Sequence, residues 1–185
     1  MTRYSIDTGF DPALFAGSSC AFGVFDGLHR GHRFLIDQAC ATAGDGRSMA
    51  ITFDRDPDEL FHPGRLQKLM TNEDRLAALE ASGVDDLVIL PSTPEFFSLE
   101  PLAFLKEVFD PAPPAHLHVG ENFRFGAKAA GTVDTLRRWG AVSGTRIHSH
   151  PLVNADGTPI SSTRIRLLLQ ESNDREAHKL LGHDL

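Results

Sequence analysis

Short runs of apolar residues alternate along the chain with longer segments whose apolar residues recur at helical spacing. The runs have the length of buried strands and lie at 19–25, 49–53, 87–90, 116–119 and 145–148. The longer segments predict helices at 31–43, 71–83, 101–109, 132–139, 162–169 and 174–181. Strands separated by helices of this length pair in parallel through right-handed crossovers, so helices cover both faces of the sheet. The pattern therefore predicts an α/β fold.

Local signals add detail to this outline. Thr71 begins a capping signal and predicts the start of the second helix. The stretch 152–160 has Asp156-Gly157 at its centre and predicts a hairpin instead of a further crossover. No internal repeat or low-complexity segment divides the chain, so we expect one domain over 1–185. The predicted inner face of the first helix comprises Phe34, Leu35 and Ala39.

Composition narrows the class of protein. The chain has 185 residues, and 18 Lys and Arg against 25 Asp and Glu give a formal net charge of −7. A hydrophobic content of 41% excludes a disordered protein, and the apolar runs are too short to span a bilayer. An acidic balance argues against a nucleic-acid partner, because such binding needs a basic face. The first residues do not resemble a signal peptide, so we expect a cytoplasmic protein with no membrane partner.

The residues that follow the first predicted strand have the composition of a phosphate-binding loop. Gly27 and Gly31 permit a tight turn and a close approach of a ligand to the backbone, while His29 and His32 share a face at the start of a helix. A helix N-terminus offers unpaired N–H groups and the positive end of its dipole to an anion. A metal pair or two surface histidines are the alternatives, but neither gives the glycines a purpose. We interpret the segment as a phosphate site.

Two further segments carry candidate ligand contacts. Hydroxyl and guanidinium groups gather at the start of the helix predicted at 162–169, where they could cap the helix or bind phosphate oxygens. The loop 120–126 follows the fourth predicted strand and combines glycines, an amide and aromatic rings, as an ordinary loop with a hydrophobic plug also would. Parallel sheets bind ligands beyond the carboxyl ends of their strands, which favours a ligand contact for both segments.

Histidines and cysteines elsewhere suggest little further chemistry. The pairs His116/His118 and His148/His150 each alternate along a predicted strand and share a face. They superficially suggest a metal site, but no carboxylate or cysteine is fixed beside them, so we expect none. Cys20 and Cys40 lie in apolar segments and are expected to be buried free thiols.

The three loop segments together resemble the bacterial FAD synthetase family, specifically its FMN adenylyltransferase module. That module belongs to the nucleotidyltransferase superfamily with a histidine-x-glycine-histidine loop. The family pattern G-x-F-D-G-x-H-x-G-H is met by Gly23–His32, G-x-[DN]-F-x-F-G by Gly120–Gly126, and S-S-T-x-I-R by Ser161–Arg166. The resemblance runs over nearly the whole chain, with the motifs in the family's order. It implies a Rossmann-like open parallel sheet of the nucleotidyltransferase type.

The resemblance also implies a reaction and the residues that carry it out. The phosphate of FMN would attack the α-phosphate of ATP, giving FAD and pyrophosphate. His29, His32 and Arg166 would be the catalytic residues, with the histidines on the triphosphate and Arg166 at its β,γ end. The expected ATP-binding residues are Gly23, Phe25, Asp26, Gly27, His29, Gly31, His32, Asn122, Ser162, Thr163, Arg164 and Arg166.

The flavin side of the predicted site is where the chain departs from the family. A flavin needs an aromatic wall, for which Phe61 and Phe125 are the first candidates and Phe96 and Phe97 the alternatives. Val24 stands where the family usually has Asn, and Asp56, before Pro57, stands where His is expected. Asp56 could face the acceptor phosphate or could point to solvent as a turn residue. The expected flavin-binding residues are Asp56, Pro57, Phe61 and Phe125.

Cofactor and partners follow from the same resemblance. Mg²⁺ is expected on the ATP phosphates, with no protein ligand named. The family's riboflavin kinase domain would begin about where this chain ends. A separate riboflavin kinase that supplies FMN is therefore an expected partner. Two other functions stay open: nucleotidyl transfer to another phosphorylated acceptor, and a non-catalytic nucleotide- or flavin-binding module.

Overall fold

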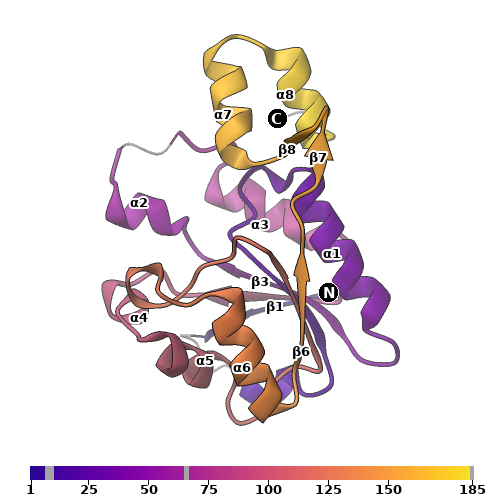
Figure 1. Cartoon of the computed structure of the whole chain (residues 1–185), viewed down its shortest axis with the longest axis vertical. Helices are drawn as coiled ribbons and strands as arrows, with labels where there is room; N and C mark the ends of the chain where they lie inside the picture. Colours follow the sequence, from indigo (N-terminus) through magenta and orange to yellow (C-terminus); the bar gives the residue numbers. More distant parts are fainter. Residues whose placement is uncertain (7–10, 65–66, 184–185) are drawn as a thin grey trace.

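Six parallel strands form the central sheet of the computed structural model, which describes residues 1–6, 11–64 and 67–183 (Figure 1). Their order across the sheet is β1-β4-β3-β2-β5-β6. The order reverses between β2 and β5, and ligands of such sheets bind beyond the carboxyl ends of the strands at this point. The strands are β1 (Thr2–Ser5), β2 (Ser19–Phe22), β3 (Ser48–Phe53), β4 (Asp86–Leu90), β5 (His116–Gly120) and β6 (Arg146–His150).

Helices connect the strands and cover both faces of the sheet. The α-helices are α1 (Arg30–Thr42), α2 (Pro57–Phe61), α3 (Asn72–Glu80), α4 (Pro94–Phe97), α5 (Pro101–Phe109), α6 (Val133–Ser143), α7 (Ser162–Gln170) and α8 (Asp174–Leu181). Short 3₁₀ turns lie at η2 (Pro12–Phe15), η3 (Asp26–Leu28) and η4 (Ala127–Ala129). After β6 the chain forms a small antiparallel hairpin, β7 (Asn154–Ala155) and β8 (Thr158–Pro159).

The alternation of side chains along the strands divides the core between the two faces. One set of strand residues, including Ala21 and Ala50, packs against α1 and α3. The opposite set, including Phe22 and Met49, packs against α5 and α6. A third apolar cluster joins α7, α8 and the β7–β8 hairpin, which together project beyond one end of the sheet (Figure 1). This C-terminal group therefore lies above the strand ends at which ligands bind.

The structure confirms the α/β fold, the five predicted strands and the hairpin at 152–160. Thr71 caps α3, as predicted, because its hydroxyl accepts from the backbone N–H of Asp74. None of the helices in the described ranges is long and apolar enough to cross a membrane.

Several details differ from the prediction, and the short helices α2 and α4 were not predicted. The edge strand β1 was not predicted, because its short polar sequence carries no buried run, and it forms by pairing with β4. Strand β2 ends at Phe22 because the chain turns through a left-handed Phe25, with φ of 61°. Phe34 is not on the inner face of α1, which is formed by Leu35, Ile36 and Ala39. Cys20 is buried, whereas Cys40 is only half-buried.

Candidate active site

A cleft of about 530 Å³ lies where the strand order reverses, between the loops that follow β2 and β5 and the start of α7. All three motif segments contribute to its walls. Among the residues predicted from the sequence, those that line it are Gly23, Phe25, Asp26, His29, Gly31, His32, Asp56, Asn122, Ser162, Thr163 and Arg166. Five predicted residues do not line it: Gly27, Arg164, Pro57, Phe61 and Phe125.

The loop after β2 is shaped by three residues with positive φ: Phe25, Gly27 and Leu28. Phe25 adopts this conformation although it has a side chain, and its ring is fully buried and meets His32 edge-on at 5.3 Å. Gly27 has φ of 78°, and a Cβ there would lie 2.6 Å from the side chain of Leu69. Gly27 therefore shapes the turn from outside the cleft. This turn directs the chain into α1, and Gly31 and His32 in the first turn of that helix line the cleft.

His29 and His32 stack on each other at the start of α1. Their ring centroids are 3.6 Å apart and the rings are nearly parallel, at 14°. His29 is the N-cap of α1, and its Nδ1 accepts from the backbone N–H of His32 at 3.3 Å. A neutral His29 that accepts at Nδ1 carries its proton on Nε2, which leaves a donor for a ligand oxygen. A Cβ at position 31 would lie 3.2 Å from the ring of His29, so Gly31 makes room for this stack.

Burial keeps the two rings uncharged in the absence of a ligand. It lowers the pKa of His29 to about 4, and it lowers the pKa of His32 well below the usual histidine value, with a further contribution from the neighbouring His29. Nδ1 of His32 is buried and has no hydrogen-bond partner among the described residues. An unpaired buried polar atom is costly, and a ligand group in the cleft is one way to satisfy it. The arrangement of the two histidines therefore favours ligand binding over the stability of the fold.

The start of α7 faces the histidines across the cleft. Ser161 caps the helix, and the hydroxyl of Ser162 donates to the carbonyl of Asp26 at 2.9 Å. Arg166 donates from Nη2 to Asp26 Oδ2 at 2.6 Å and from Nε to the carbonyl of Gln67 at 2.8 Å. The side chain of Asp26 also accepts from the backbone N–H of Leu69. Asp26 thus joins the histidine loop to α7.

Arg164 lies away from this group. Its guanidinium donates to the backbone carbonyls of Ala155, Thr158 and Pro159, so it holds the hairpin against α7. The helical periodicity explains the difference, because residues two apart on a helix point in different directions. The structure therefore places Arg166, and not Arg164, at the cleft.

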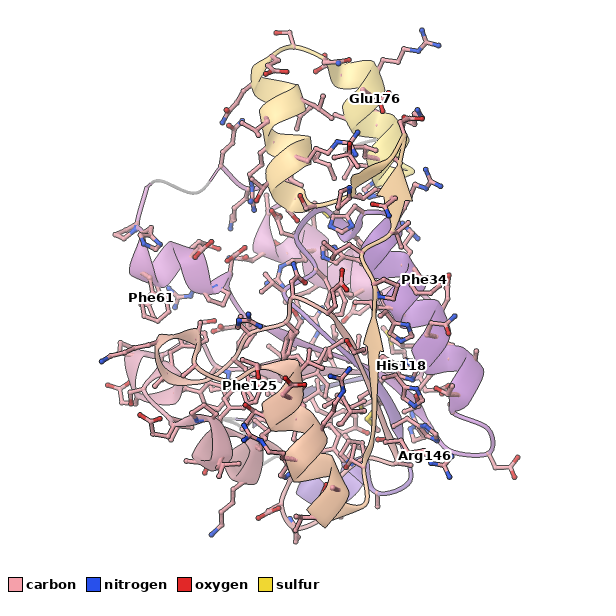
Figure 2. All side chains as sticks on the ribbon, in the orientation of Figure 1. Phe34, Phe61, His118, Phe125, Arg146 and Glu176 are labelled. Atoms are coloured by element: carbon pink, nitrogen blue, oxygen red, sulfur yellow. The ribbon has the colours of Figure 1, made fainter. Side chains whose placement is uncertain are left out.

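The loop after β5 presents a different aromatic ring from the one predicted. Phe123 lines the cleft and contacts Phe22, whereas Phe125 is only 6% exposed and packs against Phe104 in the core. Figure 2 shows Phe125 within the body of the fold and Phe61 at α2, on the side toward α4. Phe61 is 55% exposed and touches Phe97 at 5.4 Å. The rings at 123 and 125 differ in environment, and nothing in the sequence alone distinguishes them.

Asp56 does not point to solvent, although it does begin a turn of helix. It is only 7% exposed, lines the cleft and is the N-cap of α2, where its side chain accepts from the N–H of Asp58 at 2.9 Å. Burial raises its pKa above the usual range for an aspartate. Pro57 is the first residue of α2 and fits that position because it needs no hydrogen-bonded N–H. The carboxylate is therefore a structural cap at the rim of the cleft.

A buried arginine behind the cleft wall, bonded to the backbone of the cleft residue Val24, was missed from the sequence. Arg75 of α3 is 1% exposed and donates to the carbonyl of Val24 at 2.9 Å, to Thr52 Oγ1 at 2.7 Å and to the carbonyl of Phe53 at 2.8 Å. It links the ends of β2 and β3 beneath the histidine loop. A single Arg in an amphipathic helix carries no signal that would have distinguished it from a surface residue.

Comparison with known proteins identifies this arrangement. The family model described as FAD synthetase matches residues 12–164. The chain belongs to the FAD synthetase family. The matched span includes the histidine loop, the loop after β5 and the start of α7 as far as Arg164, so the resemblance inferred from the three motifs is confirmed.

Relatives in the FAD synthetase family show how much of a longer protein this chain matches. A putative bifunctional riboflavin kinase/FMN adenylyltransferase of Geobacillus thermodenitrificans is 33% identical, over 91% of this chain and 92% of that protein. The bifunctional riboflavin kinase/FMN adenylyltransferase of Pseudomonas fluorescens is 29% identical, over 90% of this chain and 54% of that protein. The corresponding Escherichia coli protein is 34% identical, over 90% and 55%. This chain therefore spans about half the length of several curated relatives.

Solved structures agree with the family's fold. A crystal structure described as a macrolide-efflux protein from Streptococcus pneumoniae superposes with a TM-score of 0.79 at 26% identity, covering 99% of this chain and 62% of that one. Pantothenate synthetase from Thermus thermophilus superposes with a TM-score of 0.55 at 20% identity, over 95% and 70%. This second likeness concerns the fold alone.

Of the three acidic side chains at the cleft of this FAD synthetase homologue, Asp26 and Asp56 are held by protein partners, whereas Asp58 is exposed. Asp26 binds Arg166 and Leu69, and Asp56 caps α2. Within the described residues no three His, Cys, Asp or Glu side chains are grouped so that they could hold a metal ion.

Proposed function

We propose that this chain transfers the adenylyl group of ATP to the phosphate of FMN, giving FAD and pyrophosphate. One observation carries the proposal: the stacked His29 and His32 at the N-terminus of α1 face Ser162, Thr163 and Arg166 of α7 across a single cleft. A helix N-terminus, two neutral imidazoles and a guanidinium together suit a triphosphate. Membership of the FAD synthetase family supports the choice of ATP and FMN as substrates.

In the proposed reaction a phosphate oxygen of FMN attacks the α-phosphorus of ATP. The new P–O bond forms as the bond between the α-phosphorus and the bridging oxygen breaks, and the electron pair leaves with pyrophosphate. FMN phosphate is already ionised near neutral pH, so no general base is required. The chain's contribution is to position the two substrates and to stabilise the charge that develops on the transferred phosphoryl group.

Each side chain has a distinct part in this proposal. His29 donates from Nε2 to a phosphate oxygen, while His32 lies nearer the reacting phosphorus. The backbone N–H groups at the start of α7 and the guanidinium of Arg166 hold the β,γ end, and Asn122 contacts the nucleotide from the loop after β5. Mg²⁺ enters with ATP as part of the substrate. The walls of this nucleotide site include Gly23, Phe25, Asp26 and Gly31.

One observation favours a second candidate for the acceptor of the adenylyl group. Asp56 is a buried carboxylate at the cleft, and a carboxylate accepts hydrogen bonds but cannot donate one to a phosphate. Transfer to another phosphorylated acceptor is therefore the second candidate function. A non-catalytic binding module has less support, because it has no use for donors aimed at a reacting phosphorus.

The experiment that tests this function is an acceptor panel. The purified protein is incubated with MgATP and, in parallel, with FMN, riboflavin and phosphorylated sugars and nucleosides, and pyrophosphate release and FAD are measured. We expect FAD and pyrophosphate in equal amounts with FMN only. Pyrophosphate release with another acceptor would support the second candidate, and no release with any acceptor would support a binding module. Supply of FMN by a riboflavin kinase and a cytoplasmic location stay predictions from the sequence.

A further inference from the structure

Four histidines lie side by side on the α1 face of β5 and β6, and the proposed chemistry does not use them. They form two hydrogen-bonded pairs, His116 Nδ1 with His148 Nε2 and His118 Nδ1 with His150 Nε2, each at 2.9 Å. His118 and His148 also stack, with centroids 4.3 Å apart and an angle of 5°. His118 lies against α1 in Figure 2, near the end of that helix remote from Phe34. Only His150 of the four lines the cleft.

A continuous chain of hydrogen bonds leads from the buried end of β2 to His150. Ser19 Oγ lies 2.8 Å from Thr42 Oγ1, Thr42 Oγ1 lies 2.7 Å from His118 Nε2, and His118 Nδ1 lies 2.9 Å from His150 Nε2. The hydroxyl of Thr42 also lies 2.8 Å from the carbonyl of Gln38, one helical turn earlier. A carbonyl is only an acceptor, so this contact takes the single hydroxyl hydrogen of Thr42.

The direction of the chain follows from that hydrogen. With its own hydrogen on Gln38, Thr42 Oγ1 accepts from His118, so His118 carries its proton on Nε2. Burial lowers the pKa of His118 to about 3 and lowers that of His150, so each ring is neutral near pH 7 and holds one proton. His118 Nδ1 then accepts from His150 Nε2, and Nδ1 of His150 is left with a lone pair.

The surroundings of His150 in the cleft are apolar. Phe34 meets its ring edge-on at 5.4 Å and 87°, and Pro151 and Leu152 continue the same wall. Phosphates would sit with the histidine loop, so this apolar wall with one polar ring is suited to the base of a nucleotide. Phe34 is exposed on α1 and contributes to this wall instead of to the core.

We propose that His150 selects the base of the bound nucleotide by accepting a hydrogen bond at Nδ1 from the exocyclic amino group of adenine. His118 and Thr42 are positioning residues that fix the ring of His150 as the acceptor tautomer. The choice of adenine rests on the proposed function. A base with a carbonyl oxygen at that position, as in inosine, would place two acceptors against each other and would bind more weakly.

The variant Thr42→Val tests the chain of hydrogen bonds from Thr42 through His118 to His150. It keeps the shape of the side chain and removes the acceptor for His118. His118 then moves its proton to Nδ1 and donates to His150, whose own proton moves to Nδ1. The pocket-facing nitrogen thereby changes from an acceptor to a donor. The matched control is His116→Gln. It alters the neighbouring pair His116/His148, which also joins β5 to β6 but does not line the cleft.

Two measurements on the whole protein are compared, neither of which requires FMN or turnover. ¹⁵N NMR of labelled histidine reads which ring nitrogen of His150 is protonated, and calorimetry gives the Kd of MgATP and MgITP. We expect the wild type to be protonated at Nε2 and to prefer ATP, and Thr42→Val to invert the tautomer and reduce the ATP/ITP preference about tenfold. His116→Gln should change neither.

A wild-type His150 that is protonated at Nδ1 would overturn the proposal, and this spectrum suffices even if Thr42→Val fails to fold. An inverted tautomer with an unchanged ATP/ITP preference would overturn it as well. Failure of the proposed adenylyl transfer has a separate signature: the tautomer and the nucleotide preference hold as expected, while MgATP and FMN give no FAD.

Discussion

Arg166 of α7 and Asp26 of the histidine loop form an ion pair of 2.6 Å across 140 residues of sequence. The side chains are 18% and 5% exposed, so the pair is largely removed from water. It fixes the C-terminal helices over the loop that carries His29 and His32. The guanidinium is thus both a structural tie and the cation at the cleft, and a ligand phosphate would share it with Asp26.

The first prediction concerns this pair. Arg166→Met leaves a buried carboxylate without its cation, which we expect to lower the free energy of unfolding by about 3 kcal/mol. Urea denaturation measures the change. The control is Arg137→Met, which breaks the exposed pair with Asp134 and should change stability by less than about 1 kcal/mol. Equal stability of Arg166→Met and wild type would show that Asp26 does not depend on Arg166.

The second prediction concerns His32. If it donates to the charge that develops at the α-phosphate, its loss removes about 3 kcal/mol of transition-state stabilisation, as does loss of one oxyanion-hole donor. We expect His32→Ala to lower kcat for FAD formation by roughly a hundred- to a thousandfold, because the interaction strengthens in the transition state. Steady-state kinetics measure this, with the exposed His62→Ala as a control. An unchanged kcat in His32→Ala would remove this ring from the chemistry.

The third prediction separates the charge of Asp56 from its role as a helix cap. Asn is as good an N-cap as Asp, so Asp56→Asn should keep the hydrogen bond to Asp58 and the stability of α2 while removing the negative charge. Repulsion between two charges at about 4 Å is on the order of 4 kcal/mol at an effective dielectric of about 20, before relaxation and screening. We therefore expect the KM for FMN to fall at least several-fold, with the KM for ATP nearly unchanged.

Asp56→His serves as the comparison for that variant. It also removes the charge but loses the cap, at a cost of about 1 kcal/mol in stability. Both variants should improve the KM for FMN. Identical FMN kinetics in the wild type, Asp56→Asn and Asp56→His would mean that the carboxylate does not face the acceptor.

The fourth prediction is a dependence of stability on pH. Burial holds the pKa of His29 at about 4 and that of His118 at about 3, whereas both titrate near 6.5 in the unfolded chain. Between these values the unfolded state binds more protons, so the free energy of unfolding falls as the pH is lowered from about 6.5 toward 4. Each ring contributes up to about 1.4 kcal/mol per pH unit in that window.

Urea denaturation at pH 7.5, 6.0 and 5.0 measures this slope. His118→Gln should make it shallower, because one buried group that must stay neutral has been removed. A wild-type stability that does not change between pH 7.5 and 5.0, or an identical slope in His118→Gln, would contradict the assignment of these rings as buried and neutral.

The sequence predicted most of the fold because its signals are local. Strand runs, helical spacing and the cap at Thr71 each depend on neighbouring residues, and the three motifs lie where parallel strands end. The edge strand β1 could not be predicted, since its stability comes from pairing with β4 and not from its own composition. The sharp turn at Phe25 was missed for a similar reason, because tertiary packing holds a non-glycine residue in a left-handed conformation.

The candidate site was predicted less completely, because the direction in which a side chain points depends on tertiary packing. Phe123 and Phe125 are equivalent in sequence, but only the former faces the cleft. Arg164 and Arg166 belong to one motif, and the helix turns one to the hairpin and the other to Asp26. Phe34 is apolar and fits a core pattern, yet it lines the cleft beside His150.

Adenylyl transfer is tested most directly by following the phosphorus atoms of ATP. The protein is incubated with FMN and Mg²⁺ and with ATP labelled at either the α- or the γ-phosphate, and the products are separated. We expect the α-label to appear in FAD and the γ-label in pyrophosphate, at equal rates. Transfer of the γ-label to an acceptor, or no transfer of the α-label to FMN, would contradict it.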